Sequence, residues 1–546
     1  MKQGLLCAAM SMTLLACAPA AEQTSNDVVD PAPAREKSSK KDFTAQGWTA
    51  KSMPEIAEAL KTGELRSVDL TRAYLERIEL VDRAGPNLQS VLTVNPNAIE
   101  DAKAADNMLK AGRALGALHG VPVLLKDNIE SKDPMATTAG ALALKDNITE
   151  RDSPLVAGLR DAGAIILGKT NLSQWANFRS SDSMSGWTAL GGQVKNPHML
   201  DRNPCGSSSG SGAAMAASLA AGTVGTETNG SIICPATING IVGFKPTVGL
   251  VAQDYIIPIS SSQDTAGPMT KTVKGAAIML TAMATGTAKT DYVAALDANA
   301  LQGTRIGVLR FAEGGNNDIK GLFNAALKDL EAAGATLVEI DAFEPDVEDF
   351  GTKSRATLNH EFKATLNAYL AETPDAVTTR TLDELIAFNI DHADIELALF
   401  DQSIFDAAAP LPDLTSPDYL SARDAVQSAT RENGIDKLLA DNNVDILVAP
   451  SGPIAPRVDP INGDVWPAWA GAGWIAAIAG YPNLTVPMGT VHALPAGISF
   501  MGGKDQDARV LSLGYAYEQR TNHRVDPQYF QTAESQSDIA RAMARK

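Results

Sequence analysis

Residues 120–128 read Gly-Val-Pro-Val-Leu-Leu-Lys-Asp-Asn, an apolar run that ends on a lysine and two polar residues. A lysine drawn into apolar surroundings loses the solvation of its charged form. Its pKa then falls toward the range in which the neutral amine acts as a base. A lysine at the end of a strand also commonly snorkels to solvent, where it has no chemical role. The residues downstream decide between these two interpretations of Lys126.

Two serine-bearing segments follow Lys126 along the chain. They read Asn-Pro-Cys-Gly-Ser-Ser-Ser-Gly-Ser-Gly-Ala-Ala over 203–214 and Gly-Thr-Glu-Thr-Asn-Gly-Ser-Ile-Ile-Cys-Pro-Ala over 225–236. A Gly/Ser-rich stretch alone is typical of a flexible linker. The alanine, methionine and leucine residues between 213 and 220 instead favour a buried helix. Because a neutral lysine can activate a serine, the combination indicates nucleophilic catalysis.

Together these segments closely resemble the amidase signature family of serine hydrolases. The resemblance implies that Ser231 is the nucleophile, Ser207 the bridging serine and Lys126 the terminal base, with an acyl-enzyme that water hydrolyses. It places the oxyanion hole at the backbone N–H groups of Thr228, Asn229, Gly230 and Ser231. In the family the bridging serine follows a cis peptide bond, which here would join Gly206 to Ser207. Supporting roles fall to Ser208, as a hydrogen-bonding group near the triad, and to Asp127 or Asn128, as groups that orient Lys126.

Three positions depart from the commonest family pattern. Glu227 stands where Asp is commonest, Asn229 where Gly is, and Ile233 where Arg is. Without that arginine the site lacks a clamp for a substrate carboxylate, which argues against the glutaminyl and asparaginyl amidotransferase subunits of the family. Within the family the two serine segments look most like those of the bacterial peptide amidases, which deamidate C-terminally amidated peptides.

The resemblance covers most of residues 50 to 525 and implies an α/β fold, a single α/β/α sandwich around a large mixed β-sheet. The residue pattern agrees, since helical patterns such as 322–332 alternate with short apolar runs at 164–168, 305–309, 336–340 and 445–449. A capping-box spacing at Ser52–Glu55 predicts that two short helices open the domain. Residues 341–440 have the pattern of a helical insertion, and Trp466, Trp469 and Trp474 are candidates for the substrate mouth or for structural roles.

A rival motif lies inside the serine tract. Residues 206–210 also fit the G-x-S-x-G elbow of the α/β-hydrolases, which would make Ser208 the nucleophile. That elbow needs a strand directly before it, but residues 195–204 are a polar loop with two prolines. No nucleotide-binding glycine motif occurs, and the six histidines lack the spacing of a metal site. We therefore expect neither a metal nor a cofactor.

The first residues predict export. A short apolar segment ends at Leu14-Leu15-Ala16-Cys17, which resembles the bacterial lipobox, in which the cysteine is lipidated. Cleavage after Ala18-Pro19-Ala20, which would release a soluble periplasmic protein, is the alternative. We expect a lipoprotein signal peptide at 1–16, a disordered spacer at 17–45, the catalytic domain at 46–530 and a polar tail at 531–546. The expected location is the periplasm, with a lipid anchor at Cys17 in the bacterial outer membrane.

Composition narrows the partners. Lys and Arg total 46 against 64 Asp and Glu, a formal net charge of -18. So acidic a chain should avoid nucleic acid and anionic membrane surfaces, leaving the lipid anchor as its contact with a membrane. Cys205 and Cys234 flank the proposed catalytic segments. We expect two buried free thiols there, although an exported protein could oxidise them to a disulfide.

These observations predict an amidase that takes a small-molecule or peptide amide. One alternative keeps the same triad and makes the protein an esterase or aryl-acylamidase. Another, from a different class, is a lipid-anchored amide-binding protein without catalysis. Covalent labelling by a fluorophosphonate that requires Ser231 would separate an enzyme from a binding protein.

Overall fold

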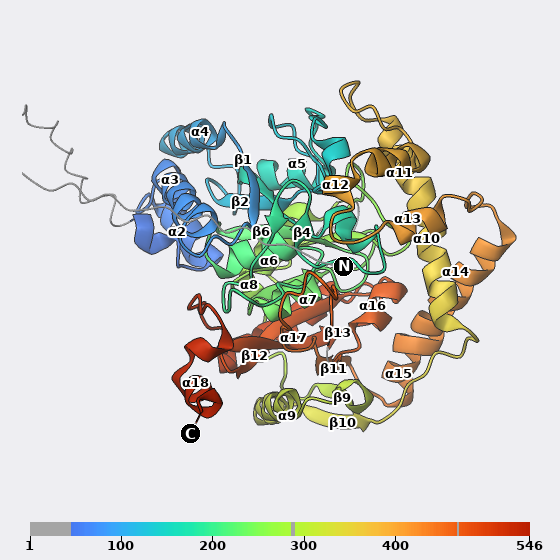
Figure 1. The fold of residues 1–546 in the computed structure, drawn as a ribbon. Helices are drawn as coiled ribbons and strands as arrows, with labels where there is room; N and C mark the ends of the chain where they lie inside the picture. The colour runs from blue at the N-terminus through green and yellow to red at the C-terminus, as the bar shows by residue number, and fades with distance from the viewer. Residues whose placement is uncertain (1–44, 286–289, 467–468, 546) are drawn as a thin grey trace, which may run out of the picture.

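The computed structural model describes residues 45–285, 290–466 and 469–545 (Figure 1). An 11-stranded mixed sheet runs through it in the order β1-β3-β2-β6-β8-β7-β12-β13-β11-β9-β10, and helices flank the sheet as an α/β/α sandwich. The strands are β1 (Val91–Val94), β2 (Pro122–Lys126), β3 (Ile165–Thr170), β6 (Gly222–Glu227), β7 (Val242–Lys245), β8 (Thr265–Thr270), β9 (Arg305–Leu309), β10 (Thr336–Ile340), β11 (Ile446–Pro450), β12 (Asn483–Val491) and β13 (Leu494–Met501). A separate pair, β4 (Trp187–Thr188) and β5 (Gly192–Gln193), is antiparallel.

Each of the four apolar runs forms a strand of this sheet, as β3, β9, β10 and β11. Strand β2 lies between β3 and β6 and is parallel to both. The carboxyl ends of β2 and β6 therefore meet at the same edge of the sheet, where open α/β sheets carry their sites. Strand β8 pairs antiparallel with β6, which makes the sheet mixed.

Most helices lie against the sheet and those of the insertion lie beyond it. They are α2 (Met53–Thr62), α3 (Ser67–Arg77), α4 (Ala98–Lys110), α5 (Pro154–Asp161), α6 (Ser209–Ala216), α7 (Ile233–Ile238), α8 (Val273–Met283), α9 (Asn317–Ala332), α10 (Phe350–Ala371), α11 (Leu382–Asp391), α12 (Ala393–Glu396), α13 (Ser403–Ala408), α14 (Pro417–Thr430), α15 (Asp436–Asp441), α16 (Gly473–Ala479), α17 (Asp507–Thr521) and α18 (Ser537–Met543). Helices α2 and α3 are the predicted opening pair, and the Ser52 backbone N–H donates to the Glu55 carboxylate at 2.9 Å.

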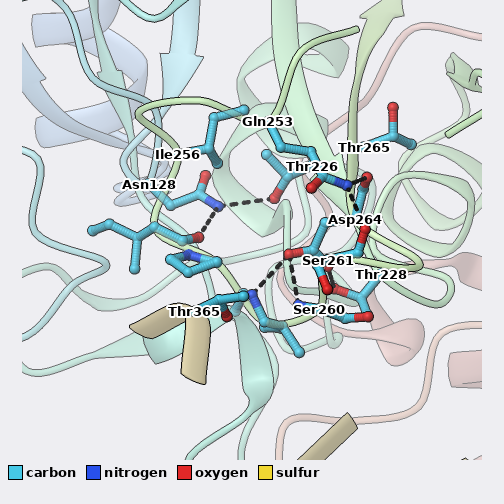
Figure 2. Close-up of a pocket in the computed structure, with 14 residues that line it drawn as sticks. Asn128, Thr226, Thr228, Gln253, Ile256, Ser260, Ser261, Asp264, Thr265 and Thr365 are labelled. Carbon is cyan, nitrogen blue, oxygen red and sulfur yellow. Dashed lines mark hydrogen bonds between the residues drawn. The ribbon is translucent and has the colours of Figure 1, made fainter. Parts of the chain in front are cut away.

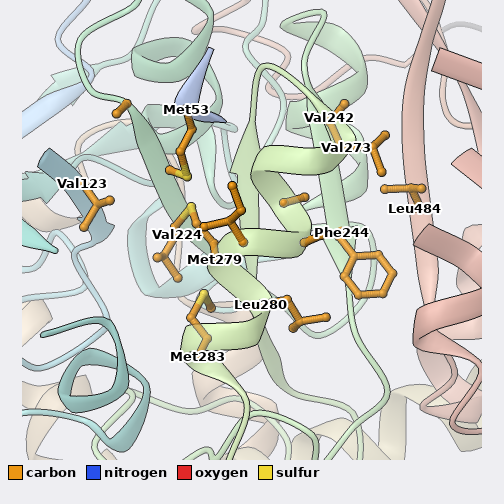
Figure 3. Packing of buried hydrophobic residues seen from close by; sticks show 14 of the residues in the cluster. Met53, Val123, Val224, Val242, Phe244, Val273, Met279, Leu280, Met283 and Leu484 are labelled. Carbon is orange, nitrogen blue, oxygen red and sulfur yellow. The ribbon is translucent and has the colours of Figure 1, made fainter. Parts of the chain in front are cut away.

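The main hydrophobic core forms where α8 covers the sheet (Figure 3). Met279 and Met283 of α8 pack with Val224 of β6 and Phe244 of β7, and all four side chains are fully buried. Because α8 is apolar on nearly every side, it suits a helix enclosed by protein rather than one that faces water. This packing fixes the strands whose ends carry the site.

Helix α6 confirms that the Ser/Gly/Ala tract is a buried helix and not a linker. Every residue from Ser209 to Ala216 is buried. Small residues are required there, since a Cβ atom at Gly210 would lie 2.3 Å from the Asn171 carbonyl oxygen and 2.4 Å from the Ser90 carbonyl oxygen. The start of α6 is thereby held against the backbone beside β3.

The insertion at 341–440 is helical, as predicted, and contains α10 to α15. It is seated on residues 139–178 through a second hydrophobic cluster, in which Phe362 of α10 contacts Phe178 and Phe405 of α13 contacts Trp175. The fully buried Arg179 and Glu396 form an ion pair at 3.3 Å between the same two regions. The insertion is thus a packed wall of the molecule.

The prediction of two free thiols at Cys205 and Cys234 is wrong, because the two cysteines form a disulfide. The loop before α6 and the first turn of α7 bring their Cα atoms to 5.9 Å, within the range that a disulfide bridges. Their separation of 29 residues in sequence gave no indication of this distance. The two cysteines approach because the loop before α6 and the start of α7 lie side by side at one edge of the sheet.

The ends of the chain are only partly described. The predicted signal peptide, Cys17 and residues 18–44 of the spacer lie outside the described residues. The predicted polar tail contains α18, in which no residue is buried. Among the described helices, none has the length and apolar composition needed to cross a bilayer.

Candidate active site

Three segments carry the predicted catalytic residues, and the fold brings them to one sheet edge. Lys126 is the last residue of β2, Ser207 lies in the loop that leads into α6, and Ser231 lies between β6 and α7. Lys126 and Ser207 are fully buried, and Ser231 is 8% exposed. The site therefore has a dry interior and an opening at Ser231.

Lys126 contacts Ser207 directly. Its Nζ lies 2.7 Å from the Ser207 Oγ, 2.8 Å from the Thr226 Oγ1 and 3.3 Å from the Thr226 carbonyl oxygen. Within the described residues no carboxylate lies at ion-pair distance from it. Burial lowers the pKa of Lys126 to about 7, against the smaller opposing effect of the charges on Asp264 and Glu227. The amine is therefore neutral in about half of the molecules near neutral pH.

The bridging serine is held by its backbone. The Gly206–Ser207 peptide bond is cis, as the resemblance implies. The Ser173 N–H donates to the Ser207 carbonyl oxygen at 2.9 Å. A Cβ atom at Gly206 would lie 2.1 Å from the Ser173 Oγ, so glycine is required before Ser207. The segment that precedes this loop has no strand, and the elbow motif at residues 206–210 is therefore accidental.

Ser208 ties the bridging segment to β6. Its hydroxyl accepts from the Thr226 N–H at 3.1 Å and donates to the Thr226 carbonyl oxygen at 3.0 Å. Its own N–H donates to the Ser231 carbonyl oxygen at 3.2 Å. Ser208 thus links the Ser207 loop to the segment that carries Ser231 without lining the cavity itself, which is consistent with its predicted supporting role.

The loop that carries Ser231 is positioned by Glu227. One Glu227 carboxylate oxygen accepts from the N–H groups of Ile232 and Ile233 at 2.7 and 2.9 Å, at the start of α7. Gly230 has φ of 85°, a conformation that favours glycine, and turns the chain just before Ser231. No hydrogen bond joins the hydroxyls of Ser207 and Ser231 among the described residues. The Lys126–Ser207 contact is therefore in place, while the Ser207–Ser231 contact is not yet made.

The predicted oxyanion donors face the opening. Residues 228–231 all line a cavity of about 550 Å³. In the described parts of the chain, the backbone N–H groups of these four residues make no hydrogen bond to protein. Free N–H donors at the rim of a cavity can stabilise a developing oxyanion.

The cavity beside Ser231 is also lined by aromatic residues and by helix α10. Trp466, Trp469 and Trp474 line it, as do residues within 350–358 at the start of α10. The tryptophan residues therefore lie where the sequence predicts a candidate substrate mouth. A cavity of this volume accommodates a group much larger than a simple amide.

The family model for amidases matches residues 69–511. The chain belongs to the amidase family. Among solved structures, this amidase is similar to the native peptide amidase from Stenotrophomonas maltophilia, with 43% identity, a TM-score of 0.83, and coverage of 89% of this chain and 99% of that one. It is also similar to the peptide amidase PAM in complex with the competitive inhibitor chymostatin, with 44% identity, a TM-score of 0.85, and coverage of 88% and 100%.

The amidase is also similar to one chain of the glutamyl-tRNA(Gln) amidotransferase of Halorhodospira halophila, which is 34% identical over 516 residues, or 88% of this chain and 99% of that one. These likenesses confirm the amidase signature fold and the resemblance to peptide amidases. The protein is an amidase, a hydrolase that acts on C–N bonds.

Sequence reasoning missed one residue that touches the amidase's lysine. The Thr226 hydroxyl accepts from Lys126 and, at 3.0 Å, from the Asn128 side-chain amide, as Figure 2 shows for Asn128. Asn128 therefore acts on Lys126 through Thr226. A signal was present, because Thr226 lies next to the last residue of β6, the strand that pairs with β2 and leads into the Ser231 loop.

Asp127 does not contact Lys126. Its carboxylate accepts from the Thr138 hydroxyl and from the Thr138 N–H, and burial raises its pKa to about 6. Successive residues of a strand point to opposite faces, so the side chain after Lys126 turns away from it. Among the described contacts, Asn128 and not Asp127 supports the lysine.

Asp264 is a further residue near the site. It accepts from the Thr228 hydroxyl at 2.5 Å and from the N–H groups of Ile259 and Ser260 at 2.7 and 2.9 Å (Figure 2). Burial raises the pKa of Asp264 to about 6. It holds the first residue of the oxyanion segment in place. Over the described residues, no group of three or more His, Cys, Asp or Glu side chains is placed to hold a metal ion.

Proposed function

We propose that this amidase hydrolyses the C-terminal carboxamide of amidated peptides through a Ser231–Ser207–Lys126 relay and an acyl-enzyme. The observation that carries the proposal is the buried Lys126 amine, 2.7 Å from the Ser207 hydroxyl and with a pKa of about 7. Likeness to peptide amidases at 43 and 44% identity supports the substrate class, as does a cavity of about 550 Å³ beside Ser231.

The first half of the reaction forms the acyl-enzyme. In this proposed step the Ser231 hydroxyl first donates a hydrogen bond to the Ser207 hydroxyl. Neutral Lys126 then takes the Ser207 proton while Ser207 takes the Ser231 proton, and the Ser231 oxygen bonds to the amide carbon. The N–H groups of residues 228–231 hydrogen-bond the carbonyl oxygen as it becomes negative.

The second half releases the amine and the acid. The C–N bond breaks, and the proton held on Lys126 returns through Ser207 to the leaving nitrogen, which departs as ammonia. A water molecule then loses its proton along the same path and attacks the acyl carbon. Collapse of that adduct frees the peptide acid and restores the Ser231 hydroxyl, so no proton is gained or lost on the enzyme.

A fluorophosphonate probe and an ammonia assay test this function together. The wild-type protein should become covalently labelled and should release ammonia from N-acetylated dipeptide amides. Ser231→Ala should abolish both. Ser421→Ala removes an exposed hydroxyl from α14, outside the cavity lining, and should leave both intact. Ammonia release from simple aliphatic amides alone, or faster cleavage of anilides and esters, would contradict the peptide assignment.

We further propose that the protein is exported and carries a lipid anchor at Cys17. The support is the lipobox-like sequence at residues 14–17. Growth of an expressing bacterium with an alkyne-tagged palmitate should label the wild-type chain and not Cys17→Ser. Recovery of unlabelled wild-type protein that begins at Ala21 would favour the soluble periplasmic form instead.

A further inference from the structure

One face of α10 lines the active-site cavity. Phe350, Gly351, Ser354, Arg355 and Leu358 reach the cavity from this helix, and their spacing of three and four residues places them on one side of it. The insertion thus contributes part of the cavity lining, next to Trp474, whose ring centroid is 5.6 Å from that of Phe350. A single charged side chain, Arg355, stands on this part of the lining.

Two acidic residues line the cavity, and neither forms an ion pair with Arg355 in the described part of the chain. One Glu227 oxygen accepts from the N–H groups of Ile232 and Ile233, and the other is buried without a hydrogen-bond partner. Asp464 accepts from the Ser185 N–H at 3.0 Å and from the Asn203 side-chain amide at 2.7 Å. The contacts of both carboxylates therefore leave Arg355 without a charged partner.

Arg355 itself makes no ion pair and no hydrogen bond with the described residues. It lies against the Phe178 ring, whose centroid is 5.6 Å from its guanidinium carbon. Desolvation lowers its pKa and no carboxylate opposes that effect, although a guanidinium stays charged at any physiological pH. By contrast, Arg179 and Arg151 also lie over aromatic rings but pair with Glu396 and Glu130.

We propose that Arg355 binds a carboxylate on the acyl part of the substrate, so that the amidase prefers C-terminally amidated peptides that carry an acidic group. The proposal rests on the proposed function. A guanidinium presents paired N–H donors that match the two oxygens of a carboxylate. A local cation is also needed for such a substrate, because a chain with a net charge of -18 repels anions as a whole.

Matched substrate pairs test this preference. N-succinyl-phenylalaninamide carries a terminal carboxylate where N-butyryl-phenylalaninamide carries a methyl group, and N-acetyl-glutamyl-phenylalaninamide and its norvaline counterpart place the same difference on a side chain. We expect wild-type kcat/KM to be about tenfold higher for the acidic member of at least one pair, as a charge-assisted hydrogen bond gives. The preference should shrink as salt is added.

Three substitutions at two positions of α10 separate the effect of a charge in the cavity from that of a charge elsewhere on the helix. Arg355→Met should remove the preference by raising KM for the acidic substrate. It should leave kcat/KM for the neutral substrate within about twofold of wild type, since only the charged interaction is lost. Arg355→Lys should keep part of the preference. Lys353→Met is the control, because it removes a positive charge two residues from Arg355. The Lys353 side chain donates to the Glu348 carbonyl oxygen and does not line the cavity. This variant should change neither the preference for the acidic substrate nor kcat/KM for the neutral one.

Equal kcat/KM within both pairs, or an equal effect of Arg355→Met on acidic and neutral members, would overturn the assignment of Arg355. A total lack of hydrolysis would overturn the proposed function instead. In that case calorimetric titration of Ser231→Ala with the succinyl and butyryl amides still decides the point. Tighter binding of the succinyl amide, lost with Arg355→Met, supports the carboxylate site, and equal binding contradicts it.

Discussion

We propose Lys126 as the base because it is buried without a counter-ion among the described residues. Desolvation lowers its pKa to about 7, so the catalytically competent, neutral form increases as pH rises through that value. We expect kcat/KM for an uncharged amide to rise with pH to a plateau, with a midpoint near the Lys126 pKa. Lys126→Met keeps the length of the side chain without the amine and should lower kcat/KM by about 10²- to 10⁴-fold, the range for loss of a general base.

Asp264 supplies a control for that pH profile. Its negative charge raises the Lys126 pKa, so Asp264→Asn should move the midpoint to lower pH and leave a single rising limb. Rates measured from about pH 5 to about pH 9 check both variants. A profile that stays flat over this range in the wild type, or a midpoint that moves upward in Asp264→Asn, would contradict Lys126 as the base.

Residue positions in the site were predictable where chain order fixes them. Lys126 ends a strand and the two serine segments follow it, and the fold brings Lys126 to Ser207 as the family resemblance implies. Thr226 was missed because its partner, Lys126, is 100 residues away in sequence. Asp127 was paired with Lys126 on adjacency alone, although alternation along a strand sends neighbouring side chains to opposite faces.

At the scale of elements, the disulfide joins the two segments that hold the proposed catalytic serines. Cys205 is two residues before Ser207, and Cys234 lies in the first turn of α7, three residues after Ser231. A bridge that closes a loop of this length stabilises a protein by about 3 kcal/mol. Cys234→Ser should therefore lower the free energy of unfolding by about that amount and reduce kcat more than KM, because Ser207 and Ser231 lose a shared tether.

Peptide mapping without reductant checks the bridge. A cross-linked peptide that contains both cysteines should appear and should vanish after reduction. Ser421→Ala removes an exposed hydroxyl from α14 and serves as the control, with unchanged urea unfolding and unchanged kcat. Quantitative alkylation of Cys205 and Cys234 in the unreduced, unfolded protein would show that the bridge is absent.

The positions of the strands and helices could largely be predicted from the sequence, whereas the pairing of the strands with one another could not. The runs at 305–309 and 336–340 are strands β9 and β10 at those residues, because a short apolar run with turn residues at its ends has few alternatives inside a large protein. The insertion of β8 between β6 and β7 depends on pairing across tens of residues. The disulfide depends on the same long-range pairing, which local patterns do not encode.

On the scale of the whole molecule, two hydrophobic cores stabilise different parts of the protein. The main core holds the sheet together, and the second core fastens the insertion beside the cavity. Phe178 belongs to the second core and also lines the cavity, so motion in this core reaches the substrate. The main core also includes Phe323 of α9, which is fully buried, as Phe405 is in the second core.

A matched pair of truncations separates the effects of the two cores. Phe405 is fully buried, with its ring centroid 5.3 Å from that of Phe362 and 5.7 Å from that of Trp175. Phe405→Ala and Phe323→Ala should each cost about 3–5 kcal/mol of unfolding free energy, because each leaves a cavity of the same size in a packed interior. Only Phe405→Ala should raise KM for an amidated dipeptide. Without the Phe405 ring, Phe362 can shift, and Phe178, whose ring centroid is 5.0 Å from that of Phe362 and which lines the cavity, should shift with it.

Urea unfolding and steady-state kinetics at a temperature where both variants remain folded measure the two effects. An equal rise of KM in both variants would mean that lost stability, and not the wall of the cavity, controls substrate binding. An unchanged KM in Phe405→Ala would mean that the insertion wall keeps its shape without that ring. A rise confined to Phe405→Ala means that the helical insertion, and not the sheet, sets the shape of the substrate cavity.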